Sequence, residues 1–336
     1  MSSSEAVVEV TRGGRVESRH RVSAAAIDEQ GQLIAWVGDP ELLTFFRSSA
    51  KPLQALPLVA DGVTEAYSVS DSELAVICAS HSAEPGHIEA VEAILSRIGC
   101  SEEDLECGVQ WPFHKETAEA MRREGKSPSR LHNNCSGKHA GMLAWSRHSG
   151  VETKDYIRAS HSVQRRICSE IGLWAGSSCE AMPVGIDGCG VPSFAQPLNV
   201  MADVFAKVVA AARHDPASPA GRVTRAMTAE PWYVAGTGRL TTRLMEATGG
   251  RLLAKYGAEA LYCLGDRERG VGVAVKIEDG QKRAIGPAVI EFLARLGLLA
   301  DDEVERLEDR HVEAVMNTRG EIVGEIRAAF QVRGAA

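Results

Sequence analysis

Residues 48–62, SSAKPLQALPLVADG, form the stretch at which the chain changes from strand to helix. Their apolar side chains recur at helical spacing, and the stretch ends at a glycine, the residue that most often stops a helix. The three preceding runs, at 5–14, 15–28 and 32–39, instead alternate or are rich in β-branched residues. The turn-forming sequence DEQGQ separates the last two of these runs. We therefore predict an N-terminal sheet that gives way to helices near residue 48.

Helical patterns dominate the middle of the chain, and strands return near its end. The sequence SVSDSE has the composition of a capping box and predicts a helix start at Asp71. The segment 183–197 is rich in Gly and Pro, so we expect irregular structure there. The remaining expected helices cover 85–97, 117–123, 142–148, 160–172, 199–213 and 287–298, and the late strands cover 258–265, 270–279 and 320–326.

This order of elements predicts the fold class. Strands at both ends with helices between them indicate an α/β (α+β) sandwich, in which one mainly antiparallel sheet is built from about 5–40 and 232–330 and is flanked by helices. A mainly helical part, about 60–230, is inserted into that sheet. A doubly wound parallel fold would alternate strand and helix along the whole chain, and this sequence does not. We expect a single domain that covers 1–336.

The composition excludes several classes of protein. The net charge is -8, and no block of Lys and Arg with interleaved aromatic residues occurs, so we expect no nucleic-acid partner but a small or neutral substrate. The N-terminal residues MSSSEAVVEV lack the basic and apolar regions of a secretory signal, and no apolar run approaches the roughly 20 residues of a membrane span. We therefore expect a cytoplasmic protein without a membrane partner.

The expected cytoplasmic location predicts the redox state of the eight cysteines. In the cytoplasm they would be mostly reduced, so each is expected to be a buried apolar residue, a metal ligand or a nucleophile. Cys78, Cys168 and Cys263 lie in apolar or helical contexts and are predicted to be core residues. Cys135 and Cys189 differ, because glycines and polar residues surround each of them.

Ser48 and Lys51 match the pattern S-x-x-K at a predicted helix start. A spacing of three on a helix brings the lysine amine beside the serine hydroxyl, so that a neutral lysine can take the serine proton. The helix N-terminus favours an alkoxide and disfavours a charged lysine. On its own, the pattern also fits a helix start with a surface lysine.

Two further motifs favour the catalytic interpretation. The motif SHS at 80–82 ends a predicted helix, and the motif KYG at 255–257 leads into the expected strand at 258–265. Penicillin-recognising serine enzymes carry three motifs of this kind in the same order.

The three motifs together predict acyl transfer. Ser48 would attack an amide carbonyl while Lys51 removes its proton, and the acyl-enzyme would then be hydrolysed. Ser80 and Lys255 would relay a proton to the leaving amine or hold the charge of the site. Two lysines close together lower each other's pKa, which suits a base that works near neutral pH.

Residues 131–141, LHNNCSGKHAG, contain many polar side chains and few apolar ones that could be buried. Cys135 and Lys138 lie there, His139 follows at once, and Cys189 of GIDGCG supplies a second thiol. Zinc favours Cys and His ligands, and a catalytic zinc keeps one position open for water or substrate. A lysine binds a metal only when deprotonated, which both a zinc ion and desolvation favour. From the residues alone, a zinc site and a pair of structural thiols both remain open.

Four long motifs, FFRSSAKPLQALPLV, ICASHSAEPGH, LHNNCSGKHAGML and GIDGCGVPSFAQPL, resemble in this order the rhizobial-type L-asparaginase family, also called asparaginase II or class 3. The similarity covers about 5–330. The resemblance implies an L-asparagine amidohydrolase that releases aspartate and ammonia, on a fold similar to serine β-lactamases and glutaminases. It also implies a homodimer whose subunits each carry two Ser-Lys tandems and one zinc ion.

The resemblance assigns roles to particular residues. The first tandem is Ser48 with Lys51 of RSSAK, where Ser48 is the nucleophile, and the second is Ser80 with Lys255 of KYGAE. Two positions depart from the family pattern. Ala83 stands where the family motif SHSGEP has glycine, and GAEAL stands where the family has GAEGV. These small changes bear on rate and loop geometry and leave the reaction type unchanged.

The remaining roles concern the metal and the substrate. His139 and Asp187 would lie beside the metal, where they hold its ligands or the substrate. Arg47 would meet the α-carboxylate of the substrate and Asp187 its α-amine, through charge-assisted hydrogen bonds. The zinc ligands implied by the resemblance are Cys135, Lys138 and Cys189.

Three alternative functions remain open at this stage. Related folds host glutaminases, so a glutaminase or a broader amidase with the same residues is one. A β-lactamase-like enzyme or peptidase is the second, and the acidic, apparently unsecreted chain argues against it. The third is a non-enzymatic zinc protein whose two cysteines hold loops together.

Overall fold

The computed structural model describes residues 6–334, so the first residue of the expected sheet, Glu5, lies outside the described residues. Contacts divide the chain into two compact units. The sheet unit comprises Met1–Ser49, Gln196–Ala210 and Arg243–Ala336, and the helical unit comprises Ala50–Ala195 and Ala211–Thr242. The expected single domain with a helical insertion at about 60–230 remains a prediction, and Gln196–Ala210, which lies within that range, belongs to the sheet unit.

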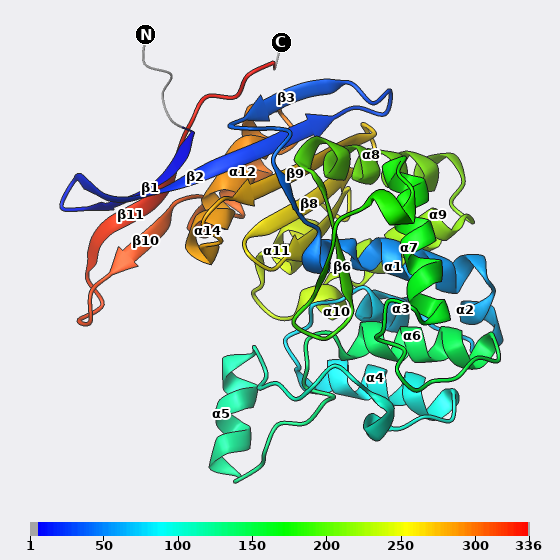
Figure 1. Cartoon of the computed structure of the whole chain (residues 1–336). Coiled ribbons are helices and arrows are strands. Elements are labelled where there is room, and N and C mark those ends of the chain that lie inside the picture. The colour runs from blue at the N-terminus through cyan, green and yellow to red at the C-terminus, as the bar shows by residue number, and fades with distance from the viewer. Residues whose placement is uncertain (1–5, 335–336) are drawn as a thin grey trace. The chain divides into compact units, whose positions relative to one another are not determined.

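The sheet unit is built on eight strands in the order β10-β11-β1-β2-β9-β8-β7, with β3 beside β2 (Figure 1). Each pairing described within it is antiparallel. The two ends of the chain meet in this sheet, because Val8 of β1 pairs with Ala328 of β11. The predicted α/β fold with a mainly antiparallel sheet from both termini is thus confirmed. The strands are β1 (Val7–Arg12), β2 (Arg15–Ile27), β3 (Leu33–Val37), β7 (Leu252–Gly257), β8 (Leu261–Asp266), β9 (Val271–Ile277), β10 (Glu313–Met316) and β11 (Ile322–Ala329).

Helices pack on this sheet through close contacts. Helix α12 (Ile285–Arg295) packs on β8, β9 and β11, and buries most of its apolar residues there. Helix α8 (Leu198–His214) approaches so closely that a Cβ at Gly272 of β9 would lie 1.9 Å from the carbonyl oxygen of Ala202. The other short elements of this unit are β4 (Leu43–Phe45), η1 (Arg47–Ala50), η4 (Lys282–Ala284), α13 (Asp301–Glu305) and α14 (Glu308–His311).

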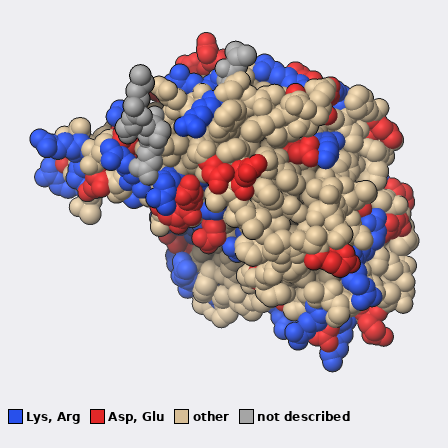
Figure 2. Space-filling model, turned by 45° about the horizontal axis from the view of Figure 1, so that its top comes forward, with Lys and Arg blue, Asp and Glu red and all other residues tan. Residues whose placement is uncertain are grey.

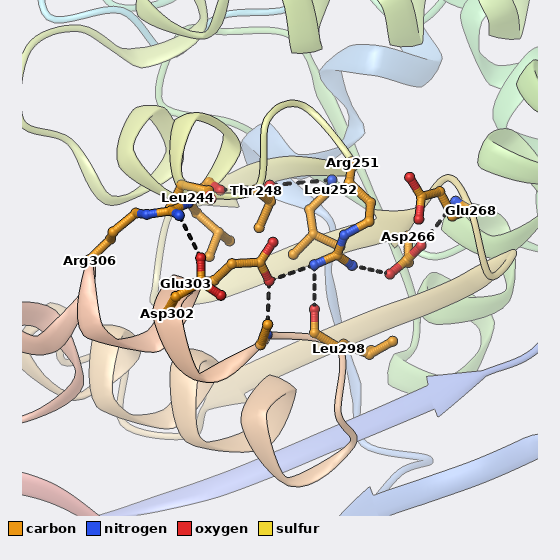
Figure 3. A network of polar contacts seen from close by, with 12 residues as sticks. Leu244, Thr248, Arg251, Leu252, Asp266, Glu268, Leu298, Asp302, Glu303 and Arg306 are labelled. Atoms are coloured by element: carbon orange, nitrogen blue, oxygen red, sulfur yellow. Dashed lines mark hydrogen bonds and ion pairs between the residues drawn. The ribbon is translucent and has the colours of Figure 1, made fainter.

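A buried ion-pair network ties β7 and β8 to the C-terminal helices (Figure 3). The Arg251 guanidinium donates to Asp266 at 2.5 Å, to Glu303 at 2.6 Å and to the carbonyl oxygen of Leu298 at 3.0 Å. The Asp266 side chain is 0% exposed, so its charge has only protein groups to compensate it. The network therefore fixes the edge of the sheet that carries β7.

We expect Arg251→Met to lower the free energy of unfolding by about 3–5 kcal/mol, because it leaves the buried Asp266 carboxylate uncompensated. Urea denaturation followed by circular dichroism measures this change. Arg295→Met is the matched control, since Arg295 pairs with Glu291 on an exposed helix face and such pairs contribute only about 0–1 kcal/mol. Equal effects of the two substitutions would contradict the structural role of Arg251.

The helical unit packs helices around α1, α3 and α6, and its chain begins at Ala50, the last residue of η1. Ser70 and Glu73 form the capping box that the sequence predicted at the start of α3. Helix α4 begins at a proline, as predicted, and ends at the expected Arg97. The helices are α1 (Lys51–Ala60), α2 (Val63–Ala66), α3 (Asp71–Ile77), α4 (Pro85–Arg97), η2 (Glu102–Asp104), α5 (Lys115–Arg123), α6 (Ser136–His148), α7 (Ser162–Ala175), η3 (Cys179–Ala181), α9 (Pro219–Ala229), α10 (Pro231–Ala235) and the start of α11 (Leu240–Ala247).

Three sequence-based expectations are wrong. The segment 183–197 contains regular structure, because β5 (Val184–Ile186) pairs antiparallel with β6 (Pro192–Pro197). Helix α6 begins at Ser136, inside the glycine-rich polar stretch and six residues before the expected start at Met142. Cys168 is not a free core thiol, since it forms a disulfide with Cys179.

The early start of α6 follows from a very close helix crossing. A Cβ at Gly137 would lie 2.1 Å from the carbonyl oxygen of Val76 in α3, and a Cβ at Gly141 would lie 2.9 Å from the Ile77 side chain. The two glycines therefore act as packing residues, not as helix breakers. The crossing holds the first turn of α6 against the end of α3, from which the chain continues to Ser80.

Figure 2 shows acidic and basic side chains interspersed over the face drawn, with no continuous basic area on it. Within residues 6–334, no helix is long and apolar enough to cross a membrane.

Candidate active site

The segment 78–84, which carries Ser80, leaves the end of α3 and lies against residues 231–237. The Ser80 amide donates to the carbonyl oxygen of Val234 at 3.0 Å, and the Ser82 hydroxyl donates to that of Ala235 at 2.6 Å. The Glu84 carboxylate accepts from the amide of Thr237 at 2.8 Å. These contacts fix the backbone around Ser80 even though it lies in neither helix nor strand.

Lys51 is the first residue of α1 and is 1% exposed. Its amine donates to the carbonyl oxygen of Ala79 at 2.5 Å, to the Ser80 hydroxyl at 3.0 Å and to the carbonyl oxygen of Asn134 at 3.4 Å. Three buried or half-buried acceptors therefore hold the amine in place, and one of them is the Ser80 hydroxyl. The helical unit therefore brings together Lys51 and Ser80, which the sequence placed in different tandems.

Ser48 lies in η1 of the sheet unit, three residues before Lys51 in the chain. It is half-buried, whereas its neighbour Ser49 is fully buried and donates to the carbonyl oxygen of Phe46 at 2.6 Å. Arg47 begins η1 with a φ of 48°, in the left-handed region that costs a non-glycine residue about 1–3 kcal/mol. Of the two adjacent serines, Ser49 is thus committed to the core, and Ser48 follows a strained residue of the kind that clusters at functional sites.

Lys255 lies within β7 itself. The sequence predicted that it would precede a strand at 258–265, the region of β8. Its side chain is 1% exposed and donates to the carbonyl oxygen of Tyr256 at 2.9 Å. At the end of the same strand, a Cβ at Gly257 would lie 2.9 Å from the carbonyl oxygen of Phe46. The sheet unit therefore brings the KYG motif against the segment that carries Arg47 and Ser48.

Cys135, Lys138 and Cys189 meet in the helical unit. Cys135 immediately precedes α6, and Lys138 lies in its first turn. The Lys138 amine donates to the Cys189 sulfur at 3.0 Å, and the Cys135 thiol donates to the side-chain oxygen of Asn134 at 2.9 Å. Cys135 and Cys189 are near enough to shift each other's pKa. Cys189 lies between β5 and β6, so the strand pair that the sequence missed is what carries it to α6.

The charges of this cluster are strongly coupled. The neighbouring Cys189, together with burial, raises the pKa of the Cys135 thiol to about 12. Cys135 in turn lowers the pKa of Cys189 well below its usual value, although burial opposes this. Burial alone would lower the pKa of Lys138, but the neighbouring sulfurs outweigh it and raise the pKa. These two shifts favour a negative charge on Cys189 and a positive charge on Lys138, which donates to it.

The cluster fits a zinc ion by its chemistry. Two buried sulfurs, near enough to shift each other's pKa, supply the soft ligands that zinc prefers, and the Lys138 amine adds a nitrogen in contact with one of them. Binding would expel the protons of Cys135 and Lys138, as zinc does from its ligands. Counting only His, Cys, Asp and Glu, residues 6–334 contain no group of three or more that could hold a metal, so the lysine is an essential part of the set.

His139 and Asp187 are neighbours of this cluster. The His139 ring is 0% exposed, and burial lowers the pKa of His139 well below its usual value. Its Nδ1 lies 2.7 Å from the hydroxyl of Tyr156, a residue that no sequence motif marked. The Asp187 carboxylate is half-buried and near enough to raise the pKa of both Lys138 and His139.

His81 is a second buried histidine that sequence reasoning did not assign. Its Nδ1 accepts from the amide of Ala83 at 3.2 Å, so its Nε2 carries the proton and donates to the Ser136 hydroxyl at 2.9 Å. Ser136 in turn donates to the carbonyl oxygen of Leu131 at 2.8 Å. His81 therefore links the segment that carries Ser80 to the start of α6, where the cluster of Cys135 and Lys138 lies.

The two departures from the family motifs share one backbone feature. Ala83 has a φ of 58° and Ala260 a φ of 51°, both in the left-handed region that favours glycine. Both side chains are buried, at 1% and 0% exposure. The backbone therefore keeps a glycine-like turn at each position although the residue is alanine.

We expect Ala83→Gly to raise the free energy of unfolding by about 0.5 kcal/mol, because removal of the left-handed strain outweighs loss of one buried methyl group. Ala75→Gly is the matched control: it lies buried in α3, where glycine costs about 1 kcal/mol in a helix. Urea titration of the two variants should give shifts of opposite sign. Destabilisation by both would mean that Ala83 is not strained.

Two comparisons with known proteins cover most of the chain. The family model described as L-asparaginase II matches residues 8–328. No curated protein matches the chain. Among solved structures, the crystal structure of the Bacillus subtilis glutaminase YbgJ in covalent complex with 5-oxo-L-norleucine is similar, with 13% sequence identity and a TM-score of 0.39. The similarity covers 83% of this chain and 89% of that chain. The family match includes each of the site residues described above.

Proposed function

Because the chain belongs to the L-asparaginase II family and is an amidohydrolase, we propose that it hydrolyses L-asparagine to L-aspartate and ammonia through a Ser-Lys nucleophile. The observation that supports this proposal best is the buried hydrogen bond between Lys51 and Ser80, at 3.0 Å. A buried lysine amine in contact with a serine hydroxyl, three residues after a second serine, is the arrangement that activates a hydroxyl for acyl transfer.

The proposed reaction has two halves. Ser48 attacks the side-chain carbonyl of asparagine while Lys51 takes its proton, which forms an ester bond to Ser48. The bond from the carbonyl carbon to nitrogen then breaks, and Ser80 passes the proton to the leaving ammonia. Water then attacks the ester carbonyl and gives up a proton through Ser80 to Lys51, which protonates the Ser48 oxygen. The bond from the carbonyl carbon to that oxygen breaks and aspartate is released. Lys255 holds a positive charge in the site throughout both halves.

The ends of the substrate need charged partners. We assign the α-carboxylate to Arg47 and the α-ammonium group to Asp187, through charge-assisted hydrogen bonds. We assign His139, whose ring is buried next to Lys138 in the chain, a further polar contact with the substrate. Glutamine is one methylene longer than asparagine, so a site that fixes both ends discriminates between them by about 1–3 kcal/mol.

We propose that Cys135, Lys138 and Cys189 hold one zinc ion. When bound, zinc supplies a Lewis acid that orients an oxygen of the substrate. The three residues also join α6 to the β5–β6 segment, and so hold Asp187 and His139 in place. The homodimer implied by the resemblance stays a prediction, which sedimentation velocity tests.

We expect Cys135→Ala to lower the zinc content to well under half an ion per chain and to raise KM for asparagine about tenfold or more, since loss of one metal-ligand contact costs on this scale. Plasma mass spectrometry measures the metal. Cys107→Ala is the matched control, because Cys107 is equally buried but donates to the carbonyl oxygen of Arg130. An unchanged zinc stoichiometry in Cys135→Ala would refute the ligand assignment.

The proposed activity is tested by ammonia release from asparagine and from glutamine, with zinc measured in the same preparation. We expect a higher kcat/KM for asparagine. A preference for glutamine would make the protein a glutaminase or broader amidase. A folded, zinc-loaded protein that releases no ammonia from any amide would instead be a zinc protein without this activity.

A further inference from the structure

Tyr156 and His139 form a hydrogen-bond chain that is closed off from solvent. Both side chains are 0% exposed. The Tyr156 hydroxyl accepts from the amide of Glu106 at 2.8 Å and lies 2.7 Å from Nδ1 of His139. The Gln164 amide donates to the carbonyl oxygen of Tyr156 at 2.9 Å, which fixes the tyrosine backbone as well. The tyrosine therefore has one orientation in the helical unit.

The direction of this chain follows from its first donor. The Glu106 amide can only donate, so the Tyr156 oxygen accepts there. The phenolic proton then has one buried acceptor left, which is Nδ1 of His139. A neutral imidazole that accepts at Nδ1 carries its own proton on Nε2. The backbone of Glu106 thus determines, through Tyr156, which nitrogen of His139 is protonated.

The Nε2–H group of His139 is an unpaired donor. Within residues 6–334 it is fully buried and has no hydrogen-bond partner. A buried donor without an acceptor costs about 1–3 kcal/mol, so it marks a place where an acceptor belongs. The side chains near enough to affect the ring electrostatically are Lys138, Cys135, Lys51 and Asp187. The proposed function assigns Cys135 and Lys138 to the zinc ion, Lys51 to proton transfer and Asp187 to the substrate.

We infer that Tyr156 is a positioning residue, which locks His139 in the tautomer that donates from Nε2 to an acceptor oxygen of the bound substrate. The oxygen belongs to a carboxylate or an amide carbonyl, the two acceptor groups of asparagine. This inference rests on the proposed amide hydrolysis for the identity of the ligand. The tautomer lock itself rests only on the three hydrogen-bonded groups.

Tyr156→Phe removes one oxygen atom and keeps the ring. Without the phenolic donor, the His139 proton distributes between both nitrogens, and the ring is no longer held in one orientation. We expect KM for asparagine to rise about tenfold, the equivalent of one hydrogen bond to a charged group, with kcat changed less than twofold. Tyr67→Phe is the matched control, since the Tyr67 ring packs edge-on against His148, and it should leave KM unchanged.

A double-mutant cycle separates positioning from general structure. If Tyr156 acts only through His139, then Tyr156→Phe has no further effect on KM in a His139→Ala background. An equal loss in both backgrounds would show that Tyr156 acts by packing and would overturn the inference.

Nitrogen NMR of the His139 ring gives a readout that does not depend on turnover. The chemical shifts of the two ring nitrogens should show Nδ1 unprotonated and Nε2 protonated in the unsubstituted protein, and a mixture in Tyr156→Phe. Protonated Nδ1 in the unsubstituted protein would overturn the inference even if the variant does not fold. If the protein hydrolyses no amide, the proposed function fails, while these shifts still decide the tautomer.

Discussion

Ser48→Ala lowers kcat for asparagine by roughly 10⁴- to 10⁶-fold, the range found when the nucleophile of a serine hydrolase is removed. The reason is that the acyl-enzyme cannot form without the Ser48 oxygen, whereas binding of substrate at Arg47 and Asp187 remains. Fold and zinc content should not change, because the Ser48 side chain is only half-buried at the start of η1. Single-turnover measurement of ammonia release gives the rate of the lost step.

Ser49→Ala is the control for Ser48. The Ser49 hydroxyl is 0% exposed and bonds to the carbonyl oxygen of Phe46, so its loss should cost about 1 kcal/mol of stability and leave kcat within a few fold. Activity retained by Ser48→Ala would mean that Ser80, which lies 3.0 Å from the Lys51 amine, is the nucleophile. Together the two variants show whether Ser48 or Ser80 is the nucleophile, with Ser49 as the control.

Gly137→Ala should destabilise the protein by about 3 kcal/mol and abolish most activity. Alanine normally stabilises a helix relative to glycine, but here its Cβ would lie 2.1 Å from the backbone oxygen of Val76, so α3 and α6 must separate. Separation moves the start of α6, which carries Cys135 and Lys138, away from the end of α3 and Ser80. Urea denaturation and ammonia release, measured on the same preparation, follow both effects.

Gly141→Ala tests the same crossing one helical turn later. Its nearest neighbours are side-chain carbons of Ile77 and Leu58, at 2.9 and 3.1 Å, which rotate more easily than a backbone carbonyl moves. We expect it to cost about 1 kcal/mol, clearly less than Gly137→Ala. If Gly137→Ala were neutral, or less harmful than Gly141→Ala, the close crossing would not be what sets the position of α6.

Periodicity in the sequence was enough to predict the sheet and most helices. The alternation over β2 and the proline at the start of α4 are local signals, and tertiary contacts do not override them. The glycines of α6 show where such signals fail. Glycine usually indicates a turn, and only the backbone of α3, about sixty residues earlier in the chain, makes Gly137 a packing residue inside a helix.

Only part of the candidate site could be predicted from the sequence, because contacts between residues distant in the chain leave no local pattern. Motifs marked Lys51, Lys138 and Cys189, because their chemistry is unusual for the surrounding sequence. The contact between Lys51 and Ser80 spans 29 positions, and no local pattern selects that pair over others. Tyr156 carried no signal, since a single tyrosine in a polar segment has no periodicity and its role depends on the backbone of Glu106. The disulfide between Cys168 and Cys179 could likewise not be predicted, because the sequence alone does not show which cysteines pair.

The most direct test of the account is covalent trapping with 5-diazo-4-oxo-L-norvaline, an asparagine analogue whose diazoketone alkylates an activated nucleophile and releases nitrogen. The zinc-loaded protein is incubated with the analogue, digested, and mapped by tandem mass spectrometry. The account predicts one adduct per chain on Ser48, prevented by excess asparagine and absent in Lys51→Met. An adduct on Ser80 or on a cysteine, in a protein that turns over asparagine, would contradict it.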